Sequence, residues 1–144
     1  MSTVQVIVDP ATFRLDQGVV TGGLWLAVDG QAFPEADWND FPLVVLGWWA
    51  EAVADLLNGG PSRELLFMDG PYLAATAATD SGRCAIRFLR GDEVKAATSD
   101  LDMALLAQQV EIAGREVERF CRSQDHNDRD VVVLGANLER LRVT

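Results

Sequence analysis

The first quarter of the chain alternates short apolar runs with turn residues, a pattern typical of β-strands. Residues 4–8 are mostly β-branched and predict a strand, which Asp9-Pro10 should end because proline cannot donate a ladder hydrogen bond. Residues 24–28 predict a second strand. Asp29-Gly30 predicts a tight hairpin turn into a short strand over residues 31–33, since glycine accepts a positive φ at little cost.

The spacing of apolar residues then becomes helical. One stripe recurs at every third or fourth position and comprises Leu46, Trp49, Val53 and Leu57. Asn39 or Asp40 is expected to cap this helix, and Pro42 suits its first turn. The run Asn58-Gly59-Gly60-Pro61 should end the helix.

The middle of the chain predicts a β-meander. Three turn signals at regular spacing, Asp69-Gly70-Pro71, Asp80-Ser81-Gly82 and Gly91-Asp92, separate strands expected over 64–68, 72–78, 84–89 and 93–98. In the third of these strands the apolar residues alternate with Arg83 and Arg87. One face of the sheet should therefore be buried and the other exposed, as in antiparallel sheets.

A second long helix follows, with Thr98 or Ser99 as the expected cap. Its apolar stripe comprises Met103, Leu106, Val110, Ala113, Val117 and Phe120. The polar loop 123–128 ends this helix, and Asp128 is placed to cap a last amphipathic helix over about 130–141, with a strand over 131–133 as the alternative. The pattern predicts an α+β fold: residues 1–144 form a single two-layer domain, with two main helices and a short C-terminal helix on one face of a mostly antiparallel sheet.

The composition of the chain narrows the classes of function and the compartment that we expect. The 144 residues carry a net charge of -10, which argues against binding nucleic acid or anionic membranes, because both require a basic surface. The chain shows no signal-peptide pattern and no apolar run of membrane-spanning length, so we expect a cytoplasmic protein. Its two cysteines, Cys84 and Cys121, are expected to be buried thiols, with a disulfide as the alternative.

Residues capable of catalysis are few. His126 is the one histidine, and it lies among acidic residues in a loop where a general base or metal ligand is conceivable, but a solvated loop explains it as well. Ser81 has turn composition, and either cysteine would need this histidine as its base. We therefore predict no catalytic residue, no metal site and no cofactor.

Charge and tryptophan are concentrated in one part of the sequence. Residues 15–62 contain no Lys or Arg, yet they hold seven carboxylates and all four tryptophans. Trp25 and Trp49 fit a strand and a helix stripe, whereas Trp38 and Trp48 lie among acids. Aromatic side chains surrounded by carboxylates suit binding to a basic protein. The predicted partner-binding residues are Glu35, Asp37, Trp38, Asp40, Trp48, Glu51 and Asp55.

Several motifs in the first half of the chain resemble small bacterial immunity-type proteins. They are Gly23-Leu24-Trp25-Leu26, Phe33-Pro34, Trp38-Asn39-Asp40-Phe41-Pro42, Trp48-Trp49 and Phe67-Met68-Asp69-Gly70-Pro71-Tyr72. Immunity proteins of this kind neutralise a toxin by binding it. The resemblance implies a stoichiometric inhibitor whose acidic face covers a toxin's basic active site, and it transfers no catalytic residue.

The leading hypothesis is therefore a non-enzymatic protein that binds a basic protein partner such as a toxin, as a monomer or homodimer. A chaperone for a secreted effector is the alternative, in which the stripe from Met103 to Phe120 serves as a dimer seam. An enzyme using His126 is the third hypothesis.

Overall fold

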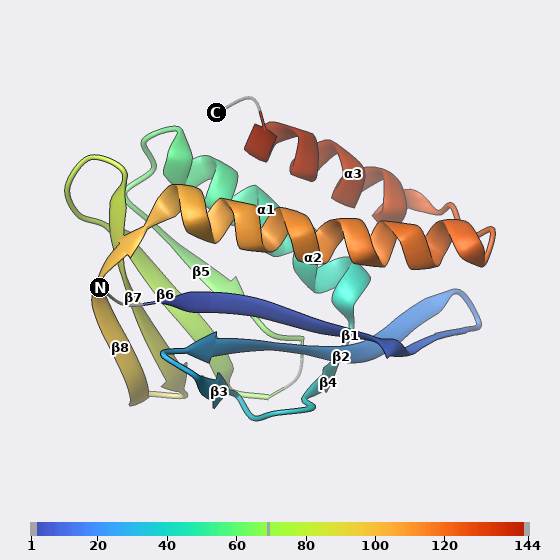
Figure 1. The fold of residues 1–144 in the computed structure, drawn as a ribbon, viewed down its shortest axis with the longest axis horizontal. Helices are drawn as coiled ribbons and strands as arrows, with labels where there is room; N and C mark the ends of the chain where they lie inside the picture. Colours follow the sequence, from blue (N-terminus) through green and yellow to red (C-terminus); the bar gives the residue numbers. More distant parts are fainter. Residues whose placement is uncertain (1–2, 69, 143–144) are drawn as a thin grey trace.

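The α+β class is confirmed in the computed structural model, which describes residues 3–68 and 70–142 (Figure 1). Asp69, in one of the expected turns, lies outside the described residues. The elements in chain order are β1 (Val4–Asp16), β2 (Val19–Val28), β3 (Gln31–Phe33), β4 (Asn39–Asp40), α1 (Pro42–Leu57), β5 (Ser62–Leu66), β6 (Tyr72–Ala78), β7 (Arg83–Arg90), β8 (Glu93–Asp102), α2 (Met103–Ser123) and α3 (Arg129–Arg142).

The strands form two antiparallel sheets where the sequence predicted one. The first sheet has the order β1-β2-β3 with β4 also paired to β2, and the second has the order β5-β6-β7-β8. The chain leaves the first sheet at the two-residue β4 and begins the second only after α1. Phe33 of β3 packs edge-to-face on Phe67, Tyr72 and Phe88, so one aromatic cluster joins the two sheets.

The first hairpin confirms the predicted turn and corrects one strand end. Asp29 and Gly30 both have positive φ, 50° and 87°, as the tight hairpin turn requires. However, Pro10 does not end β1, because the register shifts between Asp9 and Arg14 and β1 lies at the edge of its sheet. A proline at an irregular edge position leaves no ladder donor missing.

Helix α1 is the central element of the core. Eleven of its sixteen residues are buried, and it packs on α2, α3, β2 and β5. Its buried Trp49 donates an indole hydrogen bond of 2.8 Å to the Leu66 carbonyl of β5. The expected cap at Asn39 or Asp40 is wrong: Phe41 occupies the N-cap position without a side-chain hydrogen bond. Pro42 begins the helix as predicted, where its missing N–H costs nothing.

The predicted meander and its two-faced pattern are confirmed. Strands β5 to β8 pair in sequence order, and Cys84, Ile86 and Phe88 are fully buried, whereas Arg87 is exposed. Strand β8 extends beyond the expected end, through Asp102. Consequently neither Thr98 nor Ser99 caps α2, and the carboxylate of Asp102 does so by accepting a hydrogen bond from the Ala104 amide at 2.9 Å.

The apolar stripe of α2 belongs to the core. Met103, Leu106, Val110, Ala113 and Val117 are buried within the chain, and Phe120 packs partly buried against Phe13. The stripe faces α1 and β1, as shown by the contacts between these elements. It therefore cannot be the dimer seam of the chaperone hypothesis.

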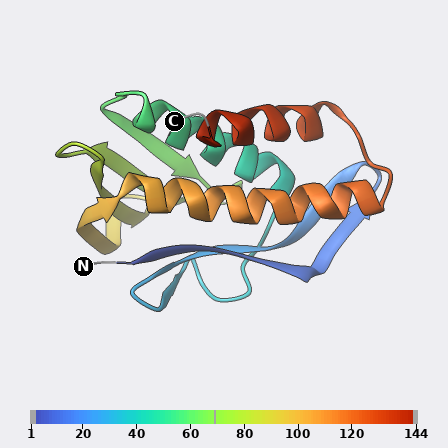
Figure 2. The ribbon, with the colours of Figure 1, turned by 45° about the horizontal axis from the view of Figure 1, so that its top comes forward.

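Helix α3 forms a further layer on top of α1 and α2 (Figures 1 and 2). The helix predicted for the last segment is thus confirmed over the alternative strand, and Asp128 accepts a hydrogen bond from the Val131 amide at 3.1 Å as the predicted cap. Leu134 and Leu138 are fully buried in the helix contact.

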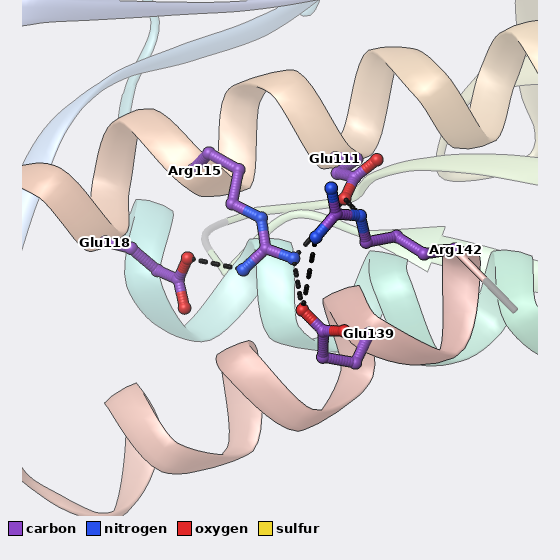
Figure 3. Close-up of polar contacts among 5 residues, drawn as sticks. All are labelled: Glu111, Arg115, Glu118, Glu139 and Arg142. Carbon is purple, nitrogen blue, oxygen red and sulfur yellow. Dashed lines mark hydrogen bonds and ion pairs between the residues drawn. The ribbon is translucent and has the colours of Figure 1, made fainter.

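An ionic network ties α3 to α2 (Figure 3). Arg115 of α2 contacts Glu118 at 2.7 Å, Glu139 of α3 at 2.8 Å and Glu111 at 3.3 Å, and Arg142 of α3 contacts Glu111 at 3.0 Å. The hydrogen bonds that Arg115 donates to these carboxylates, first to that of Glu118, raise the pKa of Arg115 above its ordinary value. Because the network has several members and is partly buried, it holds α3 better than an isolated surface pair would.

Helix α3 lies close to Gly114 of α2 and leaves room at Gly47 of α1, so alanine substitutions at these two glycines should have opposite effects. A Cβ added at Gly114 would lie 2.7 Å from a methyl carbon of Leu138, which is fully buried and cannot move aside, whereas a Cβ at Gly47 meets its nearest atom, on Val133, at 4.0 Å. We expect Gly114→Ala to lower the free energy of unfolding by about 1–2 kcal/mol through overpacking. Gly47→Ala should raise it by up to about 1 kcal/mol through helix propensity.

Urea denaturation of the two variants and the wild type, followed by circular dichroism, measures both changes. Equal effects of the same sign would contradict this account of how α3 packs.

Candidate partner-binding surface

The seven predicted partner-binding residues do not form one surface. Glu35, Asp37 and Trp38 lie in or beside the loop between β3 and β4, while the other exposed members are on α1. In Figure 1 that loop lies below the first sheet, whereas α3 and the helix layer lie above it. Glu35 and Asp37 are exposed, and Asp37 has a positive φ of 62°.

Asp40 is buried and fully used within the chain. Asp40 is only 1% exposed. Its carboxylate accepts hydrogen bonds from the Trp38 indole at 2.8 Å, the Phe41 amide at 2.7 Å and the Met68 amide at 3.2 Å. These three bonds join the loop before α1, the start of α1 and the segment after β5. Asp40 is therefore a structural residue and leaves the candidate surface.

Trp38 is held in place by the same arrangement. Its indole donates to Asp40, and its ring packs edge-to-face on Tyr72 with centroids 5.2 Å apart. The side chain is half-buried and packs against the core. Trp38 thus closes the loop over the aromatic cluster, and little of it is available to a partner.

The remaining three predicted residues lie on the one exposed stripe of α1. Trp48 is 39% exposed, Glu51 is exposed and Asp55 is half-buried, and their spacing places them along a single helix face. Every other residue between Pro42 and Leu57 is buried or half-buried. A large aromatic ring that stays exposed on an otherwise buried helix is the informative feature here.

Helix α3 contributes two residues that the sequence analysis did not select. Asp130 and Val133 line a small hollow of about 50 Å³ together with Trp48 and Glu51, and Val133 is 42% exposed. We call the set Trp48, Glu51, Asp55, Asp130 and Val133 the α1–α3 surface. The sequence signal that could have identified this part of the surface is the valine run 131–133. Its second and third valines fall outside the buried stripe of α3 and are therefore exposed.

One arginine lies beside these carboxylates. Arg63 of β5 approaches Asp55 at 3.3 Å and Glu51 at 3.6 Å. Exposed ion pairs of this kind are weak, about 0–1 kcal/mol, and a partner's cation can replace them. The α1–α3 surface thus combines three carboxylates and one guanidinium with two exposed apolar side chains.

The two cysteines considered for catalysis are poorly suited to act as nucleophiles. Both cysteines are buried and free, as the thiol interpretation predicted. Burial, then the nearby carboxylates of Asp128 and Glu118, raise the pKa of the Cys121 thiol to about 11, and burial raises the pKa of Cys84 as well. Both therefore remain protonated near neutral pH, where only a thiolate is a strong nucleophile. His126 Nε2 lies 3.2 Å from a carboxylate oxygen of Asp128, in the connection between α2 and α3.

Within residues 3–68 and 70–142, no cluster of three or more His, Cys, Asp or Glu side chains is arranged to hold a metal ion. None of the helices in this part of the chain combines the length and apolar character that a membrane span requires.

Replacing Asp40 separates its structural role from a role in binding. Asp40→Ala leaves the backbone amides of Phe41 and Met68 and the indole N–H of Trp38 without their acceptor. This loss should lower the free energy of unfolding by about 2–4 kcal/mol. Glu35→Ala, an exposed acid in the same segment, should change it by less than about 0.5 kcal/mol. Thermal unfolding of both variants tests this, and an Asp40→Ala protein as stable as the wild type would contradict the assignment.

The thiols offer a test of the cysteine environment. In the native protein at pH 8, we expect both to react with a disulfide reagent far more slowly than the same thiols in urea, because they are buried and protonated. Absorbance of the released chromophore counts the thiols. A native thiol that reacts as fast as an unfolded one would restore a cysteine to the candidates for chemistry.

The chain matches no protein-family model, and neither a curated protein nor a solved structure is significantly similar to it. What the protein binds is therefore inferred from its surface chemistry.

Proposed function

We propose that the protein is a non-enzymatic binding module that recognises a basic protein partner through the α1–α3 surface. The observation that carries the proposal is the exposed Trp48 ring, flanked by the carboxylates of Glu51, Asp55 and Asp130 and by exposed Val133. Tryptophan is enriched among the residues that dominate binding energies. Carboxylates around it favour a basic partner and speed its encounter.

The mechanism is occlusion. The Trp48 ring and Val133 supply apolar area that loses water on contact, and lysine or arginine side chains of the partner replace Arg63 beside Glu51 and Asp55. The resemblance of the first half of the chain to immunity-type proteins supports a toxin as the partner. Carboxylates would then take the place of the phosphates that a nucleic-acid-binding toxin contacts.

Rigidity supports this assignment. The α1–α3 surface lies on two helices, and Asn137 of α3 donates a hydrogen bond of 3.1 Å to the Gly47 carbonyl of α1. A surface fixed before binding loses little conformational freedom in the complex.

The expectation of cytoplasmic localisation belongs to the same proposal, because an immunity protein must meet its toxin inside the producing or target cell.

The test is capture of a partner from a lysate of the source cells by the tagged protein. The test variant combines Trp48→Ala with Asp130→Lys, and the matched control combines Ile112→Ala on α2 with Asp16→Lys at the end of β1. Both variants lose one exposed apolar side chain and reverse one exposed carboxylate.

We expect the wild type and the control to retain the same basic protein, identified by mass spectrometry, and the test variant to retain at least about tenfold less. Retention should weaken as salt is raised, because the attraction is ionic. Equal retention by test and control variants, with circular dichroism showing both folded, would overturn the proposal.

A further inference from the structure

The outer face of the second sheet carries a row of apolar residues beside a few charged ones. Its strands bury one set of alternating residues, including Leu65, Ile86 and Phe88, on the side where α1 and α2 pack. The intervening residues point the other way, and among the described elements no helix packs there. An exposed sheet face of this kind normally carries polar residues.

A continuous apolar row crosses this outer face. Leu66 pairs with Leu73, Leu73 with Leu89, and Leu89 with Val94, so the four side chains are direct cross-strand neighbours on β5, β6, β7 and β8. Leu66 and Val94, at the two ends of the row, are 42% and 48% exposed, Leu73 is half-buried, and Leu89 is 9% exposed. A contiguous row across a whole sheet differs from scattered surface apolar residues, and it indicates an interaction site.

Next to this row lies a hollow floored by small residues. The hollow has a volume of about 580 Å³, and Ala75, Ala77 and Ala85 are among the residues that line it. The remaining members of its lining include Glu64 on β5 and Arg87 on β7. The alanines leave room for long side chains from another molecule.

Three charged residues line the hollow: Arg63, which is paired with Asp55 and Glu51, and Glu64 and Arg87, which are placed symmetrically about β6. Glu64 pairs with Ala75 and Ala75 with Arg87, so the carboxylate and the guanidinium lie one strand to either side of β6 in the same row. Neither side chain makes an ion pair or side-chain hydrogen bond with another described residue. Each charge is therefore available to an external partner.

We propose that this outer face joins two copies of the chain in a two-fold symmetric dimer. A two-fold axis lying between the copies and parallel to β6 places β5 of one copy over β7 of the other and β6 over β6. Glu64 of each copy then meets Arg87 of its partner, and their long side chains fill the hollow over the alanines. Leu66 meets Leu89 and Leu73 meets Leu73, which closes the apolar row in an aligned sheet-on-sheet packing.

Charge distribution favours a second copy over a different protein. Two-fold interfaces are self-complementary, so each partner must carry both halves of every contact, as Glu64 and Arg87 do here. The chain as a whole carries a net charge of -10, which would attract a basic partner. On this face, however, the unpaired charges of Glu64 and Arg87 are opposite and cancel, so the face does not suit a strongly basic partner. The α1–α3 surface lies on the helix side of the second sheet, and Arg63 on β5 both contacts that surface and lines the hollow.

The experiment measures the mass of the purified full chain by light scattering over a range of concentrations. We expect two chains of 15.7 kDa. Glu64→Arg and Arg87→Glu should each weaken the dimer at least about tenfold, because each places like charges opposite one another twice. Mixing these two variants should restore a dimer, since one copy then carries bases at both positions and the other carries acids.

Controls keep the outcomes separate. Asp16→Arg and Arg140→Glu change the net charge by the same amounts on exposed residues outside this face, and they should leave the dimer intact. A wild-type monomer throughout the range overturns the proposal, as does a dimer that both single variants retain or that the mixture fails to restore. Leu73→Asp tests the same face without changing either charge. The purified chain alone is used, so this result is independent of partner capture.

Discussion

The burial of α1 on nearly every side is the constraint on which the rest of the structure depends. A helix without a charged residue from Pro42 to Ala50 must be covered all round, and two sheets, α2 and α3 together provide that cover. Few polar groups are available to fix its position. Asp40 does so at its beginning and the Trp49 indole does so at β5, which explains why both polar contacts are buried.

Local features of the fold were readable from the sequence, and long-range features were not. Turn residues such as Asp29-Gly30 fix the hairpin and meander connections by their own backbone preferences, so the strands between them were located correctly. Whether β4 continues into the same sheet as β5 depends on where α1 packs, which no local pattern encodes. The caps failed for a related reason: β8 pairs as far as Asp102, and this pairing, rather than the preference of Thr98, decides where α2 begins.

The candidate site was predictable only in part. Periodicity on α1 separated Trp48, Glu51 and Asp55 from the buried stripe, and these residues are exposed or half-buried as expected. Acidity alone gave no such guide for Asp40, because a carboxylate close in sequence to a helix start can either face solvent or collect buried amides. Asp130 and Val133 come from the opposite end of the chain, and only tertiary packing brings them beside Trp48.

The separation of α1 and α3 in the sequence has a consequence for synthesis on the ribosome. Helix α1 is translated about 70 residues before α3, and the side of the core that receives Leu134 and Leu138 stays open until α3 follows. The nascent chain therefore exposes an apolar helix during that interval. Such an exposed apolar surface is prone to aggregation until α3 covers it.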